Sequence, residues 1–128
     1  MKLIYVASPY AGDIENNIQY AKQACKYVLN QGKAFFCPHL LYPQILDDSN
    51  PEERKIGIIL GMEVLKKCDE IWVFGENISK GMSEEIEFAK ERGIPVKRIL
   101  QLDFEKVKKE ESKVTELEKD WELINHIF

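Results

Sequence analysis

Four short apolar runs, rich in β-branched and aromatic residues, alternate along the chain with stretches of helical periodicity. The runs lie at residues 3–7, 34–37, 71–74 and 95–100. Strands separated by helices pair in parallel, through right-handed crossovers that place helices on both faces of the sheet. The sequence therefore predicts an α/β fold, a three-layer sandwich built on a parallel sheet of four to five strands.

Residues that begin and end helices mark the segments between these runs. Asp13 is a good N-cap for a helix that ends at Gly32, and Asn50 followed by Pro51 begins a helix that runs to about residue 67. A third helix ends at Gly93, and a short one is expected at 103–109. Residues 38–50 are expected to form a long irregular connection, the kind of loop that often carries function.

With 128 residues and 45% hydrophobic content, we expect a single domain at 1–128, with a core at about 1–101 and a C-terminal helical tail at about 103–128. The tail repeats apolar residues at steps of three and four, typical of a helix that packs on another. It could dock on its own domain or form a subunit interface. The seam residues are Val114, Leu117, Trp121, Ile124 and Phe128.

Composition argues against several classes of protein. The net charge is −4 and basic residues are interleaved with acids, so no nucleic acid polymer is expected as a partner. No apolar run reaches the length of a membrane span, and the apolar N-terminal run is too short for a signal peptide. Three cysteines without C-x-x-C spacing indicate free, buried thiols and a cytoplasmic location. Two histidines, no Walker loop and no dinucleotide fingerprint predict no metal and no cofactor.

A flavodoxin- or Rossmann-like sheet binds ligands at the carboxyl ends of its strands, where the strand order reverses. For the order 2-1-3-4 this switch point lies between the first and third strands. The loops at 8–13 and 75–82 leave the sheet there, and the 38–50 connection lies on the same edge. We therefore expect the ligand site among these three segments.

One glutamate of the third helix is expected to point toward that site. On a helical wheel at about 100° per residue, Met82, Ile86 and Ala89 form the buried stripe. Glu85 lies at the edge of this stripe, whereas the other glutamates of the helix lie on the opposite face. A carboxylate in that position needs a partner or a chemical role.

The two turns at the switch point resemble phosphate cradles, with small residues and free backbone N–H groups at a helix start. They are equally consistent with ordinary turns between a strand and a helix. The candidate nucleotide- or phosphate-binding residues are Ser8, Pro9, Tyr10, Gly12, Ser79, Gly81 and Met82.

Other polar residues near this edge have a functional and a structural interpretation. Tyr5 could hydrogen-bond a carboxylate from the neighbouring turn, or it could be a core tyrosine. His39, Asp47 and Asp48 are possible substrate-loop residues, although packing, turns and caps explain them as well. Arg54 is a further lone charge near the same edge.

Two segments carry a family resemblance. Residues 4–9, IYVASP, resemble the opening strand of the nucleoside 2-deoxyribosyltransferase superfamily, which also includes deoxynucleoside-monophosphate N-glycosidases. Residues 79–96, with Ser79, Gly81, Glu85 and Ala89 at matching spacing, look like its catalytic turn. Residues 38–44, 68–75 and 79–82 are closest to an uncharacterised branch of that superfamily.

This resemblance implies roles for particular residues. Glu85 matches the catalytic glutamate that attacks C1′ of a 2′-deoxyribose, and Tyr5 matches the catalytic tyrosine that orients it. Ser79 matches the monophosphate-hydrolysing branch, because the transferases usually have aspartate there. Gly61 stands where the superfamily has an aspartate near the base, so the group that protonates the departing base is unassigned. The resemblance also implies a homo-oligomer, and the tail seam is compatible with one.

The function expected from these observations is cleavage or transfer of the N-glycosidic bond of a (deoxy)nucleoside or its 5′-monophosphate. A non-catalytic nucleotide-binding or sensing domain is the alternative, motivated by Gly61. An interaction module built around the tail is a third interpretation.

Overall fold

Four parallel strands form the centre of the computed structural model, which describes residues 1–110, 121 and 123–126. They are β1 (Leu3–Ala7), β2 (Ala34–Phe36), β3 (Glu70–Phe74) and β4 (Val96–Ile99). The order is β2-β1-β3-β4, and every pairing between neighbours is parallel. The predicted fold class and strand order are confirmed.

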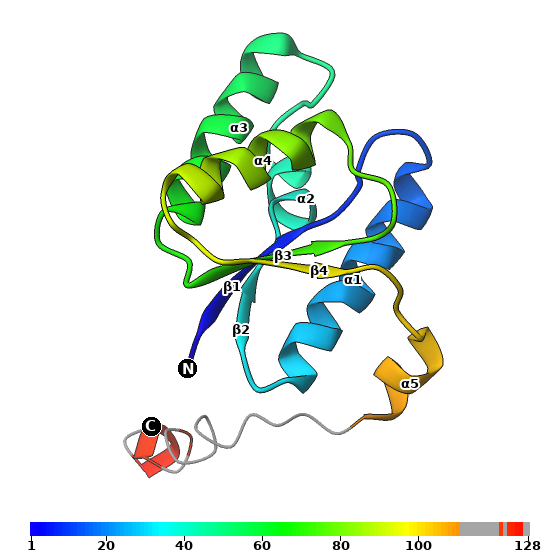
Figure 1. Cartoon of the computed structure of the whole chain (residues 1–128), viewed down its shortest axis with the longest axis vertical. Helices are drawn as coiled ribbons and strands as arrows, with labels where there is room; N and C mark the ends of the chain where they lie inside the picture. Colours follow the sequence, from blue (N-terminus) through cyan, green and yellow to red (C-terminus); the bar gives the residue numbers. More distant parts are fainter. Residues whose placement is uncertain (111–120, 122, 127–128) are drawn as a thin grey trace.

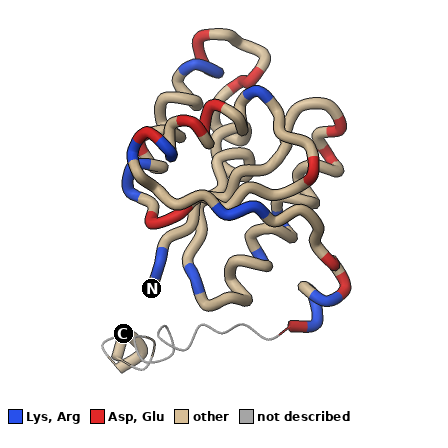
Figure 2. The backbone as a smooth tube through the Cα atoms, in the orientation of Figure 1, with Lys and Arg blue, Asp and Glu red and all other residues tan. Residues whose placement is uncertain are grey.

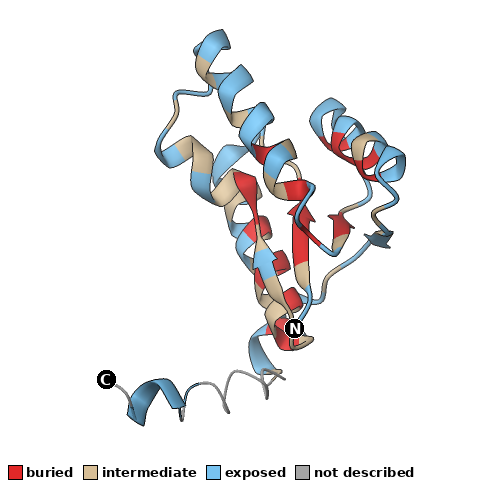
Figure 3. Ribbon diagram, turned by 90° about the vertical axis from the view of Figure 1, so that its left-hand side faces the viewer, coloured by how far each residue is buried: buried red, intermediate tan, exposed pale blue. Residues whose placement is uncertain are grey.

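Helices cover both faces of this sheet, as Figure 1 shows. α1 (Ile14–Asn30) and the short α5 (Phe104–Lys109) lie on one face. α3 (Pro51–Leu65) and α4 (Lys80–Glu91) lie on the other. Side chains of each strand alternate between the two layers, so β1 sends Ile4 and Val6 toward α1 and sends Tyr5 toward α3 and α4. Figure 3 shows the buried residues concentrated on the strands and on the helix faces that touch them.

Side-chain caps begin four of the helices. The Asp13, Asn50, Ser79 and Asp103 side chains each accept a hydrogen bond from a backbone N–H in the first turn of the helix that follows. At the other end of α4, Gly93 has a φ of 71°, a left-handed conformation that glycine adopts at little cost. The predicted helix starts at Asp13 and Asn50 are therefore confirmed.

The connection at 38–50 is more regular than predicted. It contains a one-turn helix, α2 (Pro38–Leu41), followed directly by a 3-10 turn, η1 (Tyr42–Gln44). Pro38 occupies the first turn of α2, where its missing N–H leaves no hydrogen bond unmade. The prediction of an irregular connection was wrong for residues 38–44, because one turn of helix is too short to produce a repeating apolar pattern, and residues 45–50 contain no helix or strand, as predicted.

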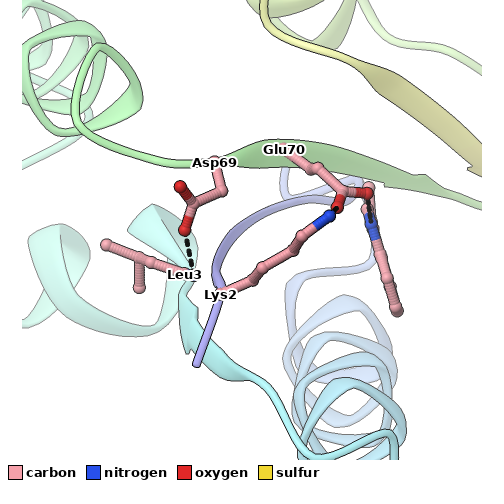
Figure 4. A network of polar contacts seen from close by, with 5 residues as sticks. Lys2, Leu3, Asp69 and Glu70 are labelled. Carbon is pink, nitrogen blue, oxygen red and sulfur yellow. Dashed lines mark hydrogen bonds and ion pairs between the residues drawn. The ribbon is translucent and has the colours of Figure 1, made fainter.

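Polar contacts join the amino ends of β1 and β3, at the edge of the sheet remote from the switch point (Figure 4). The Leu3 backbone N–H donates to Asp69 Oδ2 over 2.7 Å. Lys2 Nζ forms an ion pair with Glu70 Oε2 at 2.8 Å, and Trp72 Nε1 donates to Glu70 Oε1 at 3.1 Å. Asp69 thereby holds the start of β1 against β3.

α5, which follows β4, is joined to the end of α1 by a buried hydrogen bond, in which Asn30 Nδ2 donates to the Val107 carbonyl over 2.9 Å.

Two residues of the predicted tail seam are described: Trp121 and Ile124 are helical, and they are 62% and 43% exposed. Val114, Leu117 and Phe128 lie outside the described residues. Cys25, Cys37 and Cys68 are free and buried, as predicted. Among the described residues, no helix is long and apolar enough to cross a membrane.

Candidate active site

Glu85 is the buried carboxylate of α4. It lies in the second turn of the helix, on the same face as Met82, Ile86 and Ala89, and only 8% of its surface is exposed. The other glutamates of the helix are exposed. The prediction that Glu85 alone points inward is confirmed, and it follows from the spacing of the apolar residues.

Tyr5, from the centre of β1, is the polar neighbour of Glu85. Its side chain is 2% exposed, and its hydroxyl hydrogen-bonds the Glu85 carboxylate. Burial raises the pKa of Glu85 to about 7, with the nearby Glu84 charge adding to the rise and the Tyr5 hydrogen bond opposing it. Burial also raises the pKa of Tyr5, and the Glu85 carboxylate raises it further, so the phenol stays protonated and donates.

Gly61 of α3 brings that helix close to the same pair. A β-carbon placed on Gly61 would lie 3.2 Å from the Tyr5 hydroxyl oxygen, tighter than an ordinary contact. Glycine at this position lets α3 approach β1 and hold the phenol against Glu85.

These groups lie in a cleft of about 330 Å³ at the carboxyl edge of the sheet, which is the predicted switch point. Four segments form its walls: the loop after β1, the α2–η1 connection, one side of α3 and the start of α4. The lining residues are Tyr5, Pro9, Tyr10, Ala11, Pro38, His39, Tyr42, Pro43, Leu46, Asp48, Arg54, Gly57, Ile58, Gly61, Met62, Ser79, Lys80, Gly81, Glu84 and Glu85.

His39 and Tyr10 form an aromatic pair on the loop side of the cleft. Their ring centroids are 5.1 Å apart and their planes are inclined by 23°, a stacked arrangement. Burial lowers the pKa of His39, while the Asp48 carboxylate and the Ser8 backbone oppose the decrease. The imidazole is therefore neutral near pH 7 and lies close to a carboxylate.

Two cationic side chains also line the cleft, Arg54 from α3 and Lys80 from the start of α4. Neither forms an ion pair with another residue in the described part of the chain. Basic groups in this position, beside the N-terminus of a twelve-residue helix, favour an anionic ligand.

The cleft brings together most of the residues predicted from the sequence. Those that line it are Tyr5, Pro9, Tyr10, His39, Asp48, Ser79, Gly81 and Glu85. Four others lie outside its lining: Ser8, Gly12, Asp47 and Met82. Ser8 and Met82 are fully buried, and the Asp47 side chain accepts from Ser49 at 2.6 Å.

Ser79 caps α4 in addition to lining the cleft. Its hydroxyl oxygen accepts a hydrogen bond from the Met82 N–H over 3.2 Å and so caps α4. The hydroxyl hydrogen and a second lone pair stay available for a ligand. A phosphate-binding role for Ser79, Gly81 and Met82 remains a prediction.

Sequence reasoning did not single out Lys80, Tyr42 or Leu46 as site residues, and it treated Arg54 only as a lone charge. Tyr42 and Leu46 belong to the 38–50 connection, whose path through the structure was not predicted. Arg54 follows the strong helix start at Asn50 by one turn, so its place at the cleft depends on how α3 crosses the sheet. On this helix Gly57 faces Tyr42 and Leu46, and Gly61 faces the Tyr5 hydroxyl at closer range.

Comparison with known proteins gives a family and a fold. Residues 2–99 match the family described as a domain of unknown function, DUF7768, and the chain therefore belongs to that family. A search of curated proteins returned no match.

Several solved structures share the fold, among them the following two. The first is a 2-deoxyribosyltransferase from the psychrotolerant bacterium Bacillus psychrosaccharolyticus, with a TM-score of 0.64 and 19% identity over 85% of this chain and 92% of the other. The second is a conserved protein from Enterococcus faecalis V583, with a TM-score of 0.55 and 21% identity over 77% of this chain and 62% of the other. The resemblance to the deoxyribosyltransferase superfamily thus extends to the three-dimensional fold.

Proposed function

We propose that this member of the DUF7768 family cleaves or transfers the N-glycosidic bond of a (deoxy)nucleoside or its 5′-monophosphate. The observation that carries the proposal is the buried Glu85 carboxylate, hydrogen-bonded by Tyr5 in the cleft at the switch point of the sheet. The shared fold with a 2-deoxyribosyltransferase supports this choice over other reactions that need a buried carboxylate.

In the proposed reaction, a Glu85 carboxylate oxygen forms a bond to C1′ while the bond from C1′ to the base nitrogen breaks. The electron pair of the broken bond leaves with the base, which takes up one proton. Water, or a nitrogen of a second base, then attacks C1′ of the glycosyl ester, gives its proton to the group that protonated the first base, and restores the carboxylate. The oxocarbenium-like transition state is positively charged, so an ionised carboxylate stabilises it. The Tyr5 hydroxyl positions the attacking oxygen.

The group that protonates the departing base is assigned, in this proposal, to the protonated form of His39, which the neighbouring Asp48 carboxylate favours, because both residues line the cleft. Replacing His39 with Ala should slow release of ordinary bases. Release of 7-methylguanine from its deoxynucleoside should be unaffected, since that base leaves without taking a proton. Equal slowing on both substrates would exclude His39 as the proton source.

Arg54 and Lys80 support the monophosphate as substrate, because both line the cleft and neither forms an ion pair with another described residue. Arg54→Ala and Lys80→Ala should each lower kcat/KM for the monophosphate about tenfold and leave that for the free nucleoside nearly unchanged. Lys55→Ala is the matched control, since Lys55 is exposed on the same helix and does not line the cleft. A preference for nucleosides in the unaltered protein would contradict this assignment.

The primary test is a chromatographic screen for free base, released from deoxynucleosides, ribonucleosides and their monophosphates. The unaltered protein should release base, and Glu85→Ala should abolish release while retaining the fold. Base release that survives this substitution would rule out Glu85 as the nucleophile.

The non-catalytic alternative is favoured by Gly61, which leaves no carboxylate from α3 beside Tyr5 and Glu85. If the protein only binds nucleotides, a monophosphate should raise its melting temperature. No base should then be released, even after prolonged incubation at high protein concentration.

A further inference from the structure

The outer face of α3 carries large apolar residues, and its inner face includes two glycines. Gly57 and Gly61 face the η1 segment and Tyr5. Ile56, Ile59 and Leu60, on the opposite side, are 46%, 51% and 42% exposed. A helix on the surface of a monomer normally shows the reverse distribution, with large apolar residues toward the core.

Nothing in the described part of the chain covers this face. Ile56, Ile59 and Leu60 belong to neither hydrophobic core cluster. In Figure 3 the outer side of α3 is coloured as exposed along most of its length. Contiguous exposed apolar residues of this kind mark an interaction surface in soluble proteins.

The charged residues at the two ends of α3 indicate which kind of partner fits this apolar face. On a helical wheel, Glu52, Ile56, Ile59, Leu60 and Lys67 all fall within about 60° of one line along the helix. Glu52, at the amino end, and Lys67, just past the carboxyl end, are both exposed. Figure 2 shows charged positions toward the ends of this helix and uncharged ones between them.

This pattern is self-complementary. Residues 59 and 60 lie midway between Glu52 and Lys67, so a twofold axis beside them would bring each acidic end against a basic end. In a closed, isologous contact the same surface of both copies meets, so each charged group must lie opposite a group of opposite charge. Glu63 also lies on the face, and its charge is compensated within the chain by Lys66 at 2.7 Å.

We propose that α3 packs antiparallel against α3 of a second copy of this chain, about a twofold axis passing between Ile59 and Leu60. The apolar residues form the centre of the interface, and Glu52 pairs with Lys67 of the partner subunit at each rim. This interface is distinct from the C-terminal seam and does not depend on the proposed catalytic activity.

Sedimentation velocity on the full chain at about 100 µM tests the proposal, since a stable dimer is saturated at that concentration. The expected species has twice the monomer mass of 14.9 kDa. Ile59→Glu should raise the dimer Kd at least 100-fold, as expected for a charge at the centre of an apolar interface. Leu100→Glu is the matched control, because Leu100 is an equally exposed apolar residue at the end of β4. Circular dichroism confirms that each variant is folded.

Charge reversal tests the antiparallel arrangement. Glu52→Lys and Lys67→Glu should each weaken the dimer, because like charges then meet at both rims, and the double variant should restore it. A capping effect on α3 cannot produce this rescue, since the double variant retains lysine at position 52. A monomeric unaltered protein, or a dimer that survives Ile59→Glu, would overturn the proposal. So would a dimer lost only when residues 111–128 are deleted, or a double variant that fails to dimerise.

Discussion

Replacing Glu85 with Gln should stabilise the protein at alkaline pH while it removes the proposed nucleophile. Gln has nearly the same shape, accepts a hydrogen bond from Tyr5 through its carbonyl oxygen, and carries no charge. In the unaltered protein the Glu85 side chain is only 8% exposed, and its burial opposes ionisation of the carboxyl group.

The magnitude follows from the raised pKa. Burial moves the pKa of Glu85 from 4.5 to about 7. Each tenfold change in proton affinity is worth about 1.36 kcal/mol, so the ionised carboxylate costs the folded state roughly 3 kcal/mol. Because the folded state holds the proton more tightly than the unfolded chain, this cost is absent below pH 4.5. It grows between pH 4.5 and 7 and is complete above pH 7.

Urea denaturation at several pH values, followed by circular dichroism, measures this effect directly. The free energy of unfolding of Glu85→Gln should exceed that of the unaltered protein by roughly 3 kcal/mol at pH 8, and the two should converge near pH 4.5. Glu87→Gln, an exposed position on the same helix, is the control and should show little difference at either pH. A difference between Glu85→Gln and the unaltered protein that does not change with pH would refute the buried-carboxylate reasoning.

Three further outcomes follow from contacts in the structure. Tyr5→Phe should lower base release 10- to 100-fold and raise the pKa of Glu85, moving the acidic limb of the pH–rate profile to higher pH; an unshifted limb would contradict the hydrogen bond. Gly61→Ala should lower base release while costing about 1 kcal/mol or less of stability, because its methyl group crowds the Tyr5 hydroxyl; unchanged kinetics would show that the phenol is not held by α3. Asn30→Ala should cost about 1–3 kcal/mol in urea denaturation without altering activity, since it removes the side chain that donates to the buried Val107 carbonyl; an unchanged midpoint would contradict this.

The fold followed from local patterns in the sequence. The apolar runs that became β1 and β3, and the caps at Asp13 and Asn50, act within a few residues, so each can be recognised without knowing the rest of the chain. The alternation of strands and helices then left few topologies to consider.

The inward direction of Glu85 was predictable for the same reason, because a helical wheel needs only the residues of one helix. The walls of the cleft were not predictable. Arg54 lines the cleft from α3, which lies close to β1 where Gly61 faces the Tyr5 hydroxyl. Tyr5 and Gly61 are 56 positions apart in the sequence, so no local sequence pattern predicts their contact.

The network at the start of β1 has a practical consequence for handling the protein. Lys2 and Leu3 are held by Asp69 and Glu70 at one edge of the sheet (Figure 4), and the cleft lies at the other. The five residues of β1 separate the two by about 16 Å. A chain immobilised on a support through its first residue would therefore present the cleft away from the support, with its mouth open to the solution.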